Sequence, residues 1–129
     1  MLFRSRTAVF VQEQRIPLEI ELDAADDTAV HAVAFNRFGS AVATGRLLQP
    51  APGVGKIGRM AVHQAVRGSG VGRQVLEALM DTARSRGDRE VALHAQTAVQ
   101  DFYLRAGFRP HGEVFTEAGI PHIEMTRPT

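Results

Sequence analysis

Residues 67–73 form the segment of this chain whose composition most directly suggests chemistry. They read Arg-Gly-Ser-Gly-Val-Gly-Arg and contain three glycines in five positions, although glycine is costly in ordered structure unless the backbone needs its freedom. An apolar strand pattern precedes them and a helical pattern follows. Backbone N–H groups at the start of a helix, left uncovered by glycines, form a site for an anion such as a phosphate. Arg67 and Arg73 would add positive charge at its rim, but a tight turn that binds nothing fits the pattern equally well.

Two common phosphate-binding motifs do not fit this segment. A P-loop requires Lys and then Ser or Thr after its last glycine, whereas Gly72 is followed by Arg73 and Gln74. A dinucleotide-binding turn requires a third glycine three positions after the second. Counted from Gly68 and Gly70, that position is Arg73. What remains is the shorter pattern Arg-x-x-Gly-x-Gly between a strand and a helix.

The composition narrows the classes of function further. The chain has 129 residues, a formal net charge of +1 and no cysteine, so we expect one domain, residues 1–129, without disulfides or thiolate nucleophiles. The five histidines are scattered without the spacing of metal ligands, and we expect no metal site. No basic stripe indicates nucleic-acid binding, and no segment reads as a membrane span or signal peptide. We therefore expect a soluble, cytoplasmic protein.

The periodicity of apolar residues predicts the elements that position the glycine turn. A helical stripe indicates a helix over residues 2–14, ended by Pro17. Apolar positions at every fourth residue predict a second helix from Val71, closed by Gly87. Thr97 and Gln100 have capping-box spacing and predict the start of a short third helix. Strands are expected at residues 29–35, 41–48, 56–62 and 90–95 and, as a hairpin around residues 117–119, within 112–125. The order predicts a mixed α/β or α+β sheet.

Two segments together resemble the GNAT superfamily of N-acetyltransferases, which use acetyl-coenzyme A. The glycine turn "RGSGVG" matches the family's pyrophosphate loop, and "DFYLRAGF" at 101–108 matches its later aromatic-Tyr and Gly-Phe segment. One helix and one strand separate the two motifs, as in the family. The segments "VFVQEQRIP", "GRMAV" and "GIPHIEM" resemble the ElaA-like branch, and the resemblance covers nearly the whole chain.

The resemblance implies where acetyl-CoA binds. The family's strand before the turn exposes its backbone to the pantetheine arm, which places Met60, Ala61 and Val62 against the cofactor. The pyrophosphate would lie on the turn, on residues Arg67, Gly68, Ser69, Gly70, Val71, Gly72 and Arg73. The resemblance also implies that the next strand splays away and leaves a V-shaped slot for the arm.

The resemblance further implies a general acid. Tyr103 is the only tyrosine of the chain and falls on the family's acid position. A phenol with a pKa near ~10 is a plausible proton donor to a thiolate whose acid has a pKa near ~8.5. The alternative is a tyrosine that only packs on its helix.

The general base is expected to be a histidine. His122 in "GIPHIEM" matches a position where relatives carry a histidine proposed as base, and its ordinary pKa near ~6.5 suits that role. In a strand, His122 and Glu124 point to the same face, so Glu124 is expected to orient the imidazole. A surface histidine beside an unrelated glutamate is the alternative. His94 is the second candidate.

Three residues are expected on the acceptor side, and the N-terminus departs from the family. Related enzymes use an arginine at the position of Arg59 to bind a substrate carboxylate, and the alternative is an arginine that faces solvent or pairs with a nearby carboxylate. Arg6 would assist Arg59, and Gln96 would cap the helix or line the pocket. Family members usually begin with a strand before the first helix, whereas this sequence starts inside or just before that helix. The resemblance therefore implies a GNAT-like mixed sheet flanked by helices with the family's first strand missing, either because the copy is shortened or because the strand lies upstream of this sequence. An edge exposed in this way often pairs with a second copy, which would give a homodimer.

Two functions compete at this point. The leading one is an acetyl-CoA-dependent N-acetyltransferase that moves an acetyl group to the amine of a small molecule by direct attack in a ternary complex. The alternative is a non-catalytic acyl-CoA-binding or regulatory module, suggested by the lack of a carboxylate in residues 56–62. Tyr103 and His122 favour the enzyme.

Overall fold

The computed structural model describes residues 3–11, 16–24 and 29–129 of the chain, with side chains from residue 19 onward. These residues form eight strands, two α-helices and two short 3₁₀ turns. The strands are β1 (Phe3–Val11), β2 (Ile16–Ala24), β3 (Val30–Asn36), β4 (Ala41–Ala51), β5 (Val54–Val62), β6 (Glu90–Gln96), β7 (Arg109–Glu117) and β8 (Ile120–Pro128). The helices are α1 (Val71–Ser85) and α2 (Gln100–Arg105), and the 3₁₀ turns are η1 (Gln64–Val66) and η2 (Thr97–Val99).

The strands form one sheet in the order β1-β2-β3-β4-β5-β6-β8-β7. All neighbours pair antiparallel except β5 and β6, which are parallel. A parallel pair needs a long crossover connection, and α1 provides it. The hairpin β7–β8 turns through Ala118 and Gly119, both with positive φ (51° and 76°), as the favoured two-residue turns require.

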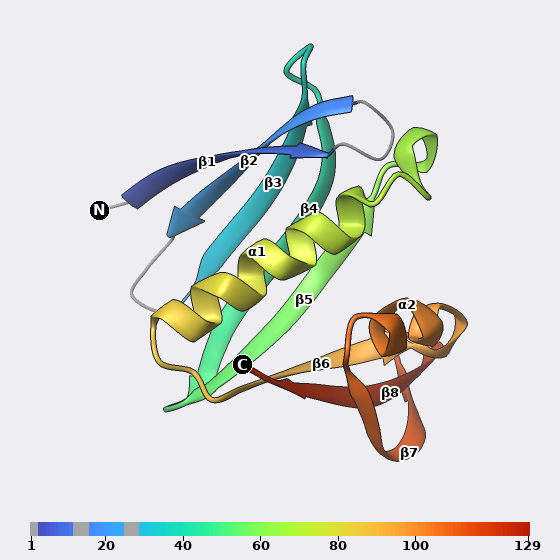
Figure 1. The fold of residues 1–129 in the computed structure, drawn as a ribbon. Coiled ribbons are helices and arrows are strands. Elements are labelled where there is room, and N and C mark those ends of the chain that lie inside the picture. The colour runs from blue at the N-terminus through green and yellow to red at the C-terminus, as the bar shows by residue number, and fades with distance from the viewer. Residues whose placement is uncertain (1–2, 12–15, 25–28) are drawn as a thin grey trace.

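Helix α1 packs along one face of the sheet, over β3, β4 and β5 (Figure 1). Its apolar stripe is fully buried at Val75, Leu76, Leu79 and Met80, because these positions recur every three or four residues on one side of the helix. A Cβ on Gly45 of β4 would lie only 2.9 Å from Leu79 Cδ1. Glycine at this strand position therefore lets the helix approach the sheet closely.

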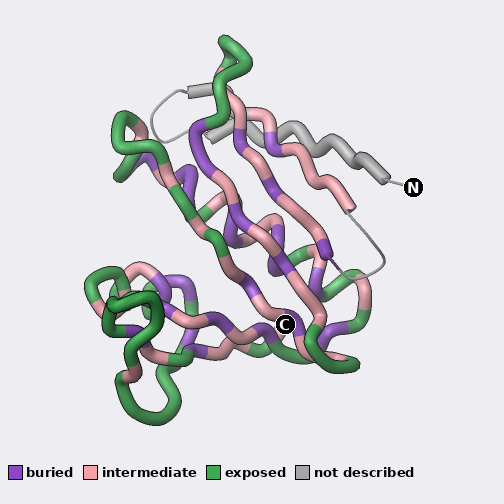
Figure 2. The backbone as a smooth tube through the Cα atoms, turned by 180° about the vertical axis from the view of Figure 1, so that it is seen from behind, coloured by how far each residue is buried: buried purple, intermediate pink, exposed green. Residues whose placement is uncertain are grey.

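A second part of the core lies where β6 and β8 meet α2. Phe108 and Met125 are fully buried there, and Leu93 is 2% exposed. Seen from behind, buried segments follow the middle of the strands, while the hairpin β7–β8 is largely exposed at its outer end (Figure 2). The sheet thus has its apolar interior on the α1 side and a more accessible opposite face.

The N-terminal prediction is wrong. Residues 3–11 form strand β1, not a helix, and pair antiparallel with β2 from Phe3↔Ala24 to Val11↔Ile16. The segment holds Phe3, Thr7 and Val9–Val11, aromatic and β-branched types that favour a strand, and the pairing along β2 supplies the hydrogen bonds that a helix would have made internally. The expectation of a missing first strand rested on that helix and loses its basis.

The other predicted elements are confirmed, with one correction at α2. Thr97 and Gln100 do not form a capping box, because residues Thr97–Val99 form a 3₁₀ turn first and α2 begins at Gln100 after Val99. The N-cap Val99 has no side chain able to cap the helix.

Candidate active site

Strands β5 and β6 diverge next to α1. They pair only from Val54↔Glu90 to Ile57↔Leu93, although β5 continues to Val62 and β6 to Gln96. The two ribbons separate beyond that point (Figure 1). The splay that the resemblance implied is therefore present, and β6 does not pair with the backbone of Gly58–Val62.

A bulge in β5 marks the point of divergence. The register with β4 shifts between Thr44↔Ala61 and Arg46↔Gly58, and Arg59 has a φ of 54°. A left-handed conformation costs an L-residue about 1–2 kcal/mol, so the surrounding pairing must hold it in place. Bulges bend a strand and end its pairing, which fits the separation of β5 from β6.

The glycine turn follows β5 directly. His63 Nδ1 accepts a hydrogen bond from Ala65 N at 3.0 Å and caps η1. Gly68 and Gly70 then adopt φ values of 83° and 90°, which reverse the chain into α1. A Cβ on Gly72 would lie 3.0 Å from Val62 Cγ2, so this glycine seats the start of the helix against the end of β5.

The turn offers a subset of its amides to a ligand. Ser69 N donates to Val66 O at 3.1 Å, and Val71 N donates to Ser69 Oγ at 3.4 Å. Within the described residues, the other amides at the start of α1 have no acceptor, as is usual for the first turn of a helix. These are the backbone N–H groups of Gly68, Gly70, Gly72 and Arg73.

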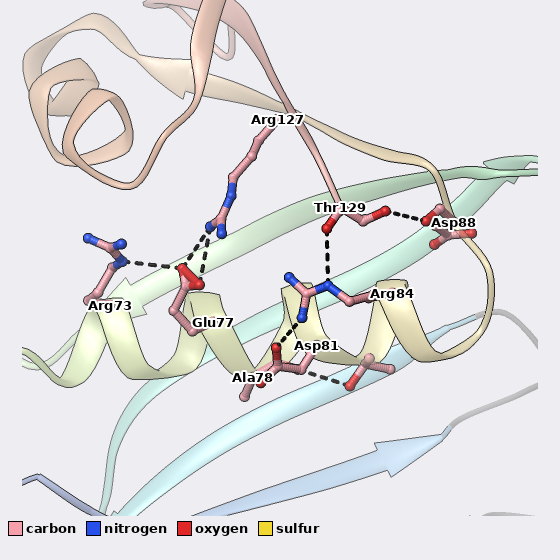
Figure 3. Close-up of polar contacts among 9 residues, drawn as sticks. Arg73, Glu77, Ala78, Asp81, Arg84, Asp88, Arg127 and Thr129 are labelled. Carbon is pink, nitrogen blue, oxygen red and sulfur yellow. Dashed lines mark hydrogen bonds and ion pairs between the residues drawn. The ribbon is translucent and has the colours of Figure 1, made fainter.

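The two rim arginines differ in how they are held. Arg67 Nε donates to Val62 O at 3.3 Å, and Arg67 makes no ion pair within the described part of the chain. Arg73 Nε lies 3.2 Å from Glu77 Oε2, and Arg73 Nη1 donates to Arg105 O at 3.3 Å. Glu77 also accepts from Arg127 of β8 at 2.8 Å (Figure 3).

This network lowers the pKa of the Glu77 carboxyl. Burial alone would raise it, but the hydrogen bonds and charges of Arg127 and Arg73 bring the pKa below its ordinary value. Glu77 is therefore ionised at neutral pH and offsets part of the charge of Arg73. Arg67 is the rim cation whose charge is left for a bound anion.

Two histidines and a glutamate meet on the sheet face opposite α1. Glu117 Oε1 lies 3.0 Å from His94 Nδ1, and Glu117 Oε2 lies 3.6 Å from His122 Nε2. Phe115 packs between the two rings, edge-on to His94 at 5.0 Å and stacked with His122 at 6.0 Å. A hydrogen bond from His94, opposed by a smaller effect of burial and aided by nearby positive charges, lowers the pKa of Glu117.

The hydrogen bonds fix which nitrogen of each ring is free. His122 Nδ1 lies 2.7 Å from the carbonyl oxygen of Ile120, and since a carbonyl only accepts, Nδ1 carries the hydrogen. The same argument assigns the Nδ1 hydrogen of His94, which faces the ionised Glu117. With Nδ1 carrying a hydrogen in each ring, Nε2 is the nitrogen that is left to accept a proton.

The prediction that Glu124 orients His122 is wrong. The two residues share a face of β8, but the antiparallel register places Glu124 opposite His94 and Gln96 opposite His122. Glu124 Oε2 lies 3.9 Å from His94 Nε2. The carboxylate next to His122 comes from Glu117, across the β7–β8 turn.

Tyr103 lies on α2, apart from this histidine cluster. It is 8% exposed and its ring contacts Phe102 and Phe108 edge-on at 5.0 and 6.0 Å. Burial raises the pKa of its phenol above the ordinary value of 10.0, so the hydroxyl stays protonated at neutral pH. Within the described residues, that hydroxyl has no hydrogen-bond partner.

The three predicted acceptor-side residues have different positions. Arg59 is exposed at the bulge, and Gln96 is exposed at the end of β6, opposite His122. Arg6 lies in β1, which β2, β3 and β4 separate from β5, and its side chain lies outside the described residues. The structure thus places Arg59 and Gln96 at the splay and does not bring the backbone of Arg6 there.

Sequence reasoning missed Glu117 and Arg46. Glu117 lies in the predicted turn, and this position could have indicated that it is close to His122. It follows two residues after Phe115, which is the cross-strand partner of His122. Arg46 was a single charged residue in an alternating strand, which normally faces solvent.

Among the described residues, no helix is long and apolar enough to cross a membrane, and no group of three His, Asp or Glu side chains is placed to hold a metal ion.

Comparison with known proteins defines the class. A family model described as "Acetyltransferase (GNAT) domain" matches residues 8–128. The chain therefore belongs to the GNAT acetyltransferase family. This membership supports acyltransferase activity with an acyl-CoA donor.

Individual relatives indicate a branch of the GNAT family to which the chain is similar. The chain is 37% identical to Protein ElaA of Escherichia coli, over 98% of this chain and 84% of ElaA. The crystal structure of ElaA superposes with a TM-score of 0.70 and 28% identity, over 98% of this chain and 99% of that one. The chain is also 36% identical to the uncharacterized N-acetyltransferase YjcF of Bacillus subtilis, over 97% and 89% of the two lengths. An acyl-CoA N-acyltransferase structure from Pseudomonas aeruginosa shares 39% identity with a TM-score of 0.66, over 77% of this chain and 68% of that one.

Proposed function

We propose that this protein is an acetyl-CoA-dependent N-acetyltransferase that acetylates the amine of a small molecule by direct attack in a ternary complex. One observation carries the proposal: β5 stops pairing with β6 after Ile57 and leads directly into a turn with unpartnered amides. The strand can hold an extended arm, and the turn can hold a diphosphate at the end of that arm. The similarity to the N-acetyltransferase YjcF and to the acyl-CoA N-acyltransferase from Pseudomonas aeruginosa supports the same chemistry.

The donor would be held mainly by backbone groups. Met60, Ala61 and Val62 line the open edge of β5 and would hydrogen-bond the pantetheine arm. The diphosphate would accept from the amides of Gly68, Gly70, Gly72 and Arg73, with the guanidinium of Arg67 beside it. Ser69 and Val71 would shape the turn, because their own amides are already engaged.

His122 would act as general base. The acceptor amine arrives as an ammonium ion, and the attack needs its neutral form. Nε2 of His122 would take that proton, and the Glu117 carboxylate 3.6 Å away would attract the charge gained by the ring. His94, hydrogen-bonded to the same carboxylate, is the second candidate. Arg59 and Gln96 would contact the acceptor at the mouth of the splay.

Tyr103 would act as general acid. As the new C–N bond forms and the C–S bond breaks, the phenol would give its proton to the departing thiolate. The proton that the attacking nitrogen loses on becoming an amide would then restore the phenol. Burial raises the pKa of the phenol, so the proton is present on its oxygen at neutral pH when the thiolate forms.

Release of free thiol from acetyl-CoA in the presence of a panel of small amines tests the proposal. We expect turnover with at least one class of amine, and loss of the new thiol signal when acetyl-CoA or the amine is omitted. Tight coenzyme A binding with no turnover for any amine would contradict the enzyme and favour a non-catalytic acyl-CoA-binding module.

A further inference from the structure

Within the part of the chain that the structure describes, the guanidinium of Arg46 has no hydrogen-bond or ion-pair partner. Its Nε is buried and makes no hydrogen bond, and among the described residues no carboxylate or carbonyl accepts from the rest of the group. A buried donor left unsatisfied costs about 1–3 kcal/mol. Such a cost is tolerable where a ligand supplies the missing acceptor.

Arg46 lies on the same face of the sheet as the histidine cluster. Its neighbours Gly45 and Leu47 face α1: Leu47 is fully buried and Gly45 lies against Leu79. Successive residues of a strand point to opposite faces, so Arg46 projects from the other side. The buried neighbours of His94, Leu93 and Ala95, place that histidine on the same side.

The guanidinium reaches the start of the splay. Arg46 pairs with Gly58, and a Cβ on Gly58 would lie 3.9 Å from Arg46 Nη2, with no other described group beyond its chain neighbours within 4 Å. Gly58 follows Ile57, the last β5 residue paired with β6, and His94 follows its partner Leu93. Arg46 and His94 therefore stand on the two sides of the point where the strands separate.

We propose that Arg46 binds a carboxylate of the acceptor, so that the acceptor is a small amine that also carries a carboxylate. This inference rests on the proposed acetyltransferase function. Arginine suits the task because its planar donors match a carboxylate in pairs. The diphosphate of the donor is not the partner of Arg46, because it would lie on the glycine turn beyond the end of β5. Gly58, which pairs with Arg46, lies four residues before that end, a distance of roughly 13 Å at the rise of a strand.

Binding to the protein saturated with coenzyme A tests the inference without turnover. The panel consists of small amino acids, each paired with its carboxamide, and calorimetry gives both dissociation constants. For the unmodified protein we expect at least one pair in which the carboxylate binds about 10- to 100-fold more tightly, the range of a hydrogen bond to a charged group.

The variants identify the residue responsible. Arg46→Met should bring the carboxylate-to-carboxamide ratio close to one, and Arg46→Lys should retain part of it. Arg37→Met is the matched control, since it removes the same charge from an exposed turn where the guanidinium lies over the Phe38 ring at 4.8 Å; its ratio should equal that of the parent. Coenzyme A affinity should be unchanged in all three variants.

Two results would overturn the inference: a parent with no preference for the carboxylate in any pair, or an Arg46→Met variant that keeps the preference. Failure of the parent to bind coenzyme A would instead overturn the proposed function, because it removes the donor site. The ratio of two ligands on one variant is insensitive to a partial loss of folded protein, so poor folding of Arg46→Met does not mimic the expected result.

Discussion

The two faces of the sheet at the splay are built from different kinds of residue. The face under α1 is packed with Leu47, Val75 and Leu79, which are fully buried. The opposite face carries Arg46 and the cluster of His94, Glu117 and His122, with the rings ordered by hydrogen bonds. One face maintains the fold and the other supplies ionisable groups, so substitutions on the two faces should have separable effects.

The largest effect, on the affinity for coenzyme A, is expected at the glycine turn between β5 and α1. Gly70→Glu should raise the coenzyme A dissociation constant more than about 100-fold, because a carboxylate repels the diphosphate and φ of 90° disfavours any side chain. Calorimetric titration measures this. Gly39→Glu is the control, since Gly39 also has a positive φ of 78° and nothing lies within 4 Å of its Cβ position. Equal affinity in the two variants would place the diphosphate elsewhere.

On the α1 face, Leu79→Ala should lower the free energy of unfolding by about 2–5 kcal/mol, because it leaves a cavity against the sheet. His94→Ala, on the opposite face, should cost about 1 kcal/mol or less. Urea denaturation compares the two. The distinction between the faces would be lost if both variants were destabilised equally.

Tyr103→Phe should lower kcat by about 100-fold, the lower end of general acid catalysis, with little change in coenzyme A affinity. The pH dependence of the rate offers a second test of the acid role. The phenol donates only when protonated, so the parent's rate should fall at a pH above the ordinary tyrosine range, because burial raises the pKa. This decline should be missing in Tyr103→Phe. An unchanged kcat would remove Tyr103 from the mechanism.

The smallest effect concerns the ion pairs that join α1 to β8. The pKa of Glu77 is lowered in the folded protein from an ordinary value of 4.5, so its stabilising contribution is present above that pH and is lost as pH falls through the folded-state pKa. Glu77→Gln should therefore destabilise at neutral pH, by less than about 1 kcal/mol for a group this exposed. Its deficit relative to the parent should disappear in acid, as measured by Tm against pH. A deficit that stays constant with pH would contradict the assignment.

The parts of the fold that could be predicted are those set by local patterns. The helix from Val71, the β3–β4 and β7–β8 hairpins and the glycine turn each depend on periodicity or turn residues close together in the chain. The apolar residues of segment 3–11 suit either a helical or a strand period, and the sequence pattern predicts a helix there, whereas the observed strand is defined by its pairing with β2. The residues of segment 3–11 alone do not show that β2 is their pairing partner.

The site was predictable to the same extent. Parity along β8 correctly placed His122 and Glu124 on one face, but the carboxylate next to His122 belongs to β7 and depends on the hairpin register. In the sequence, Arg46 has the pattern of an ordinary solvent-facing strand residue, and only the pairing with Gly58 defines where its guanidinium lies. Residue types were visible in the sequence, and their partners required three-dimensional structure.

The most direct test of the donor site is an amide-resolved NMR titration of the ¹⁵N-labelled protein with coenzyme A. Saturable binding should shift most strongly the backbone amides of Gly68, Gly70, Gly72 and Arg73, which have no acceptor within the described residues. The amides of Ser69 and Val71, already bonded within the turn, should shift less. Absence of binding by folded protein, or shifts centred away from this turn, would contradict the account.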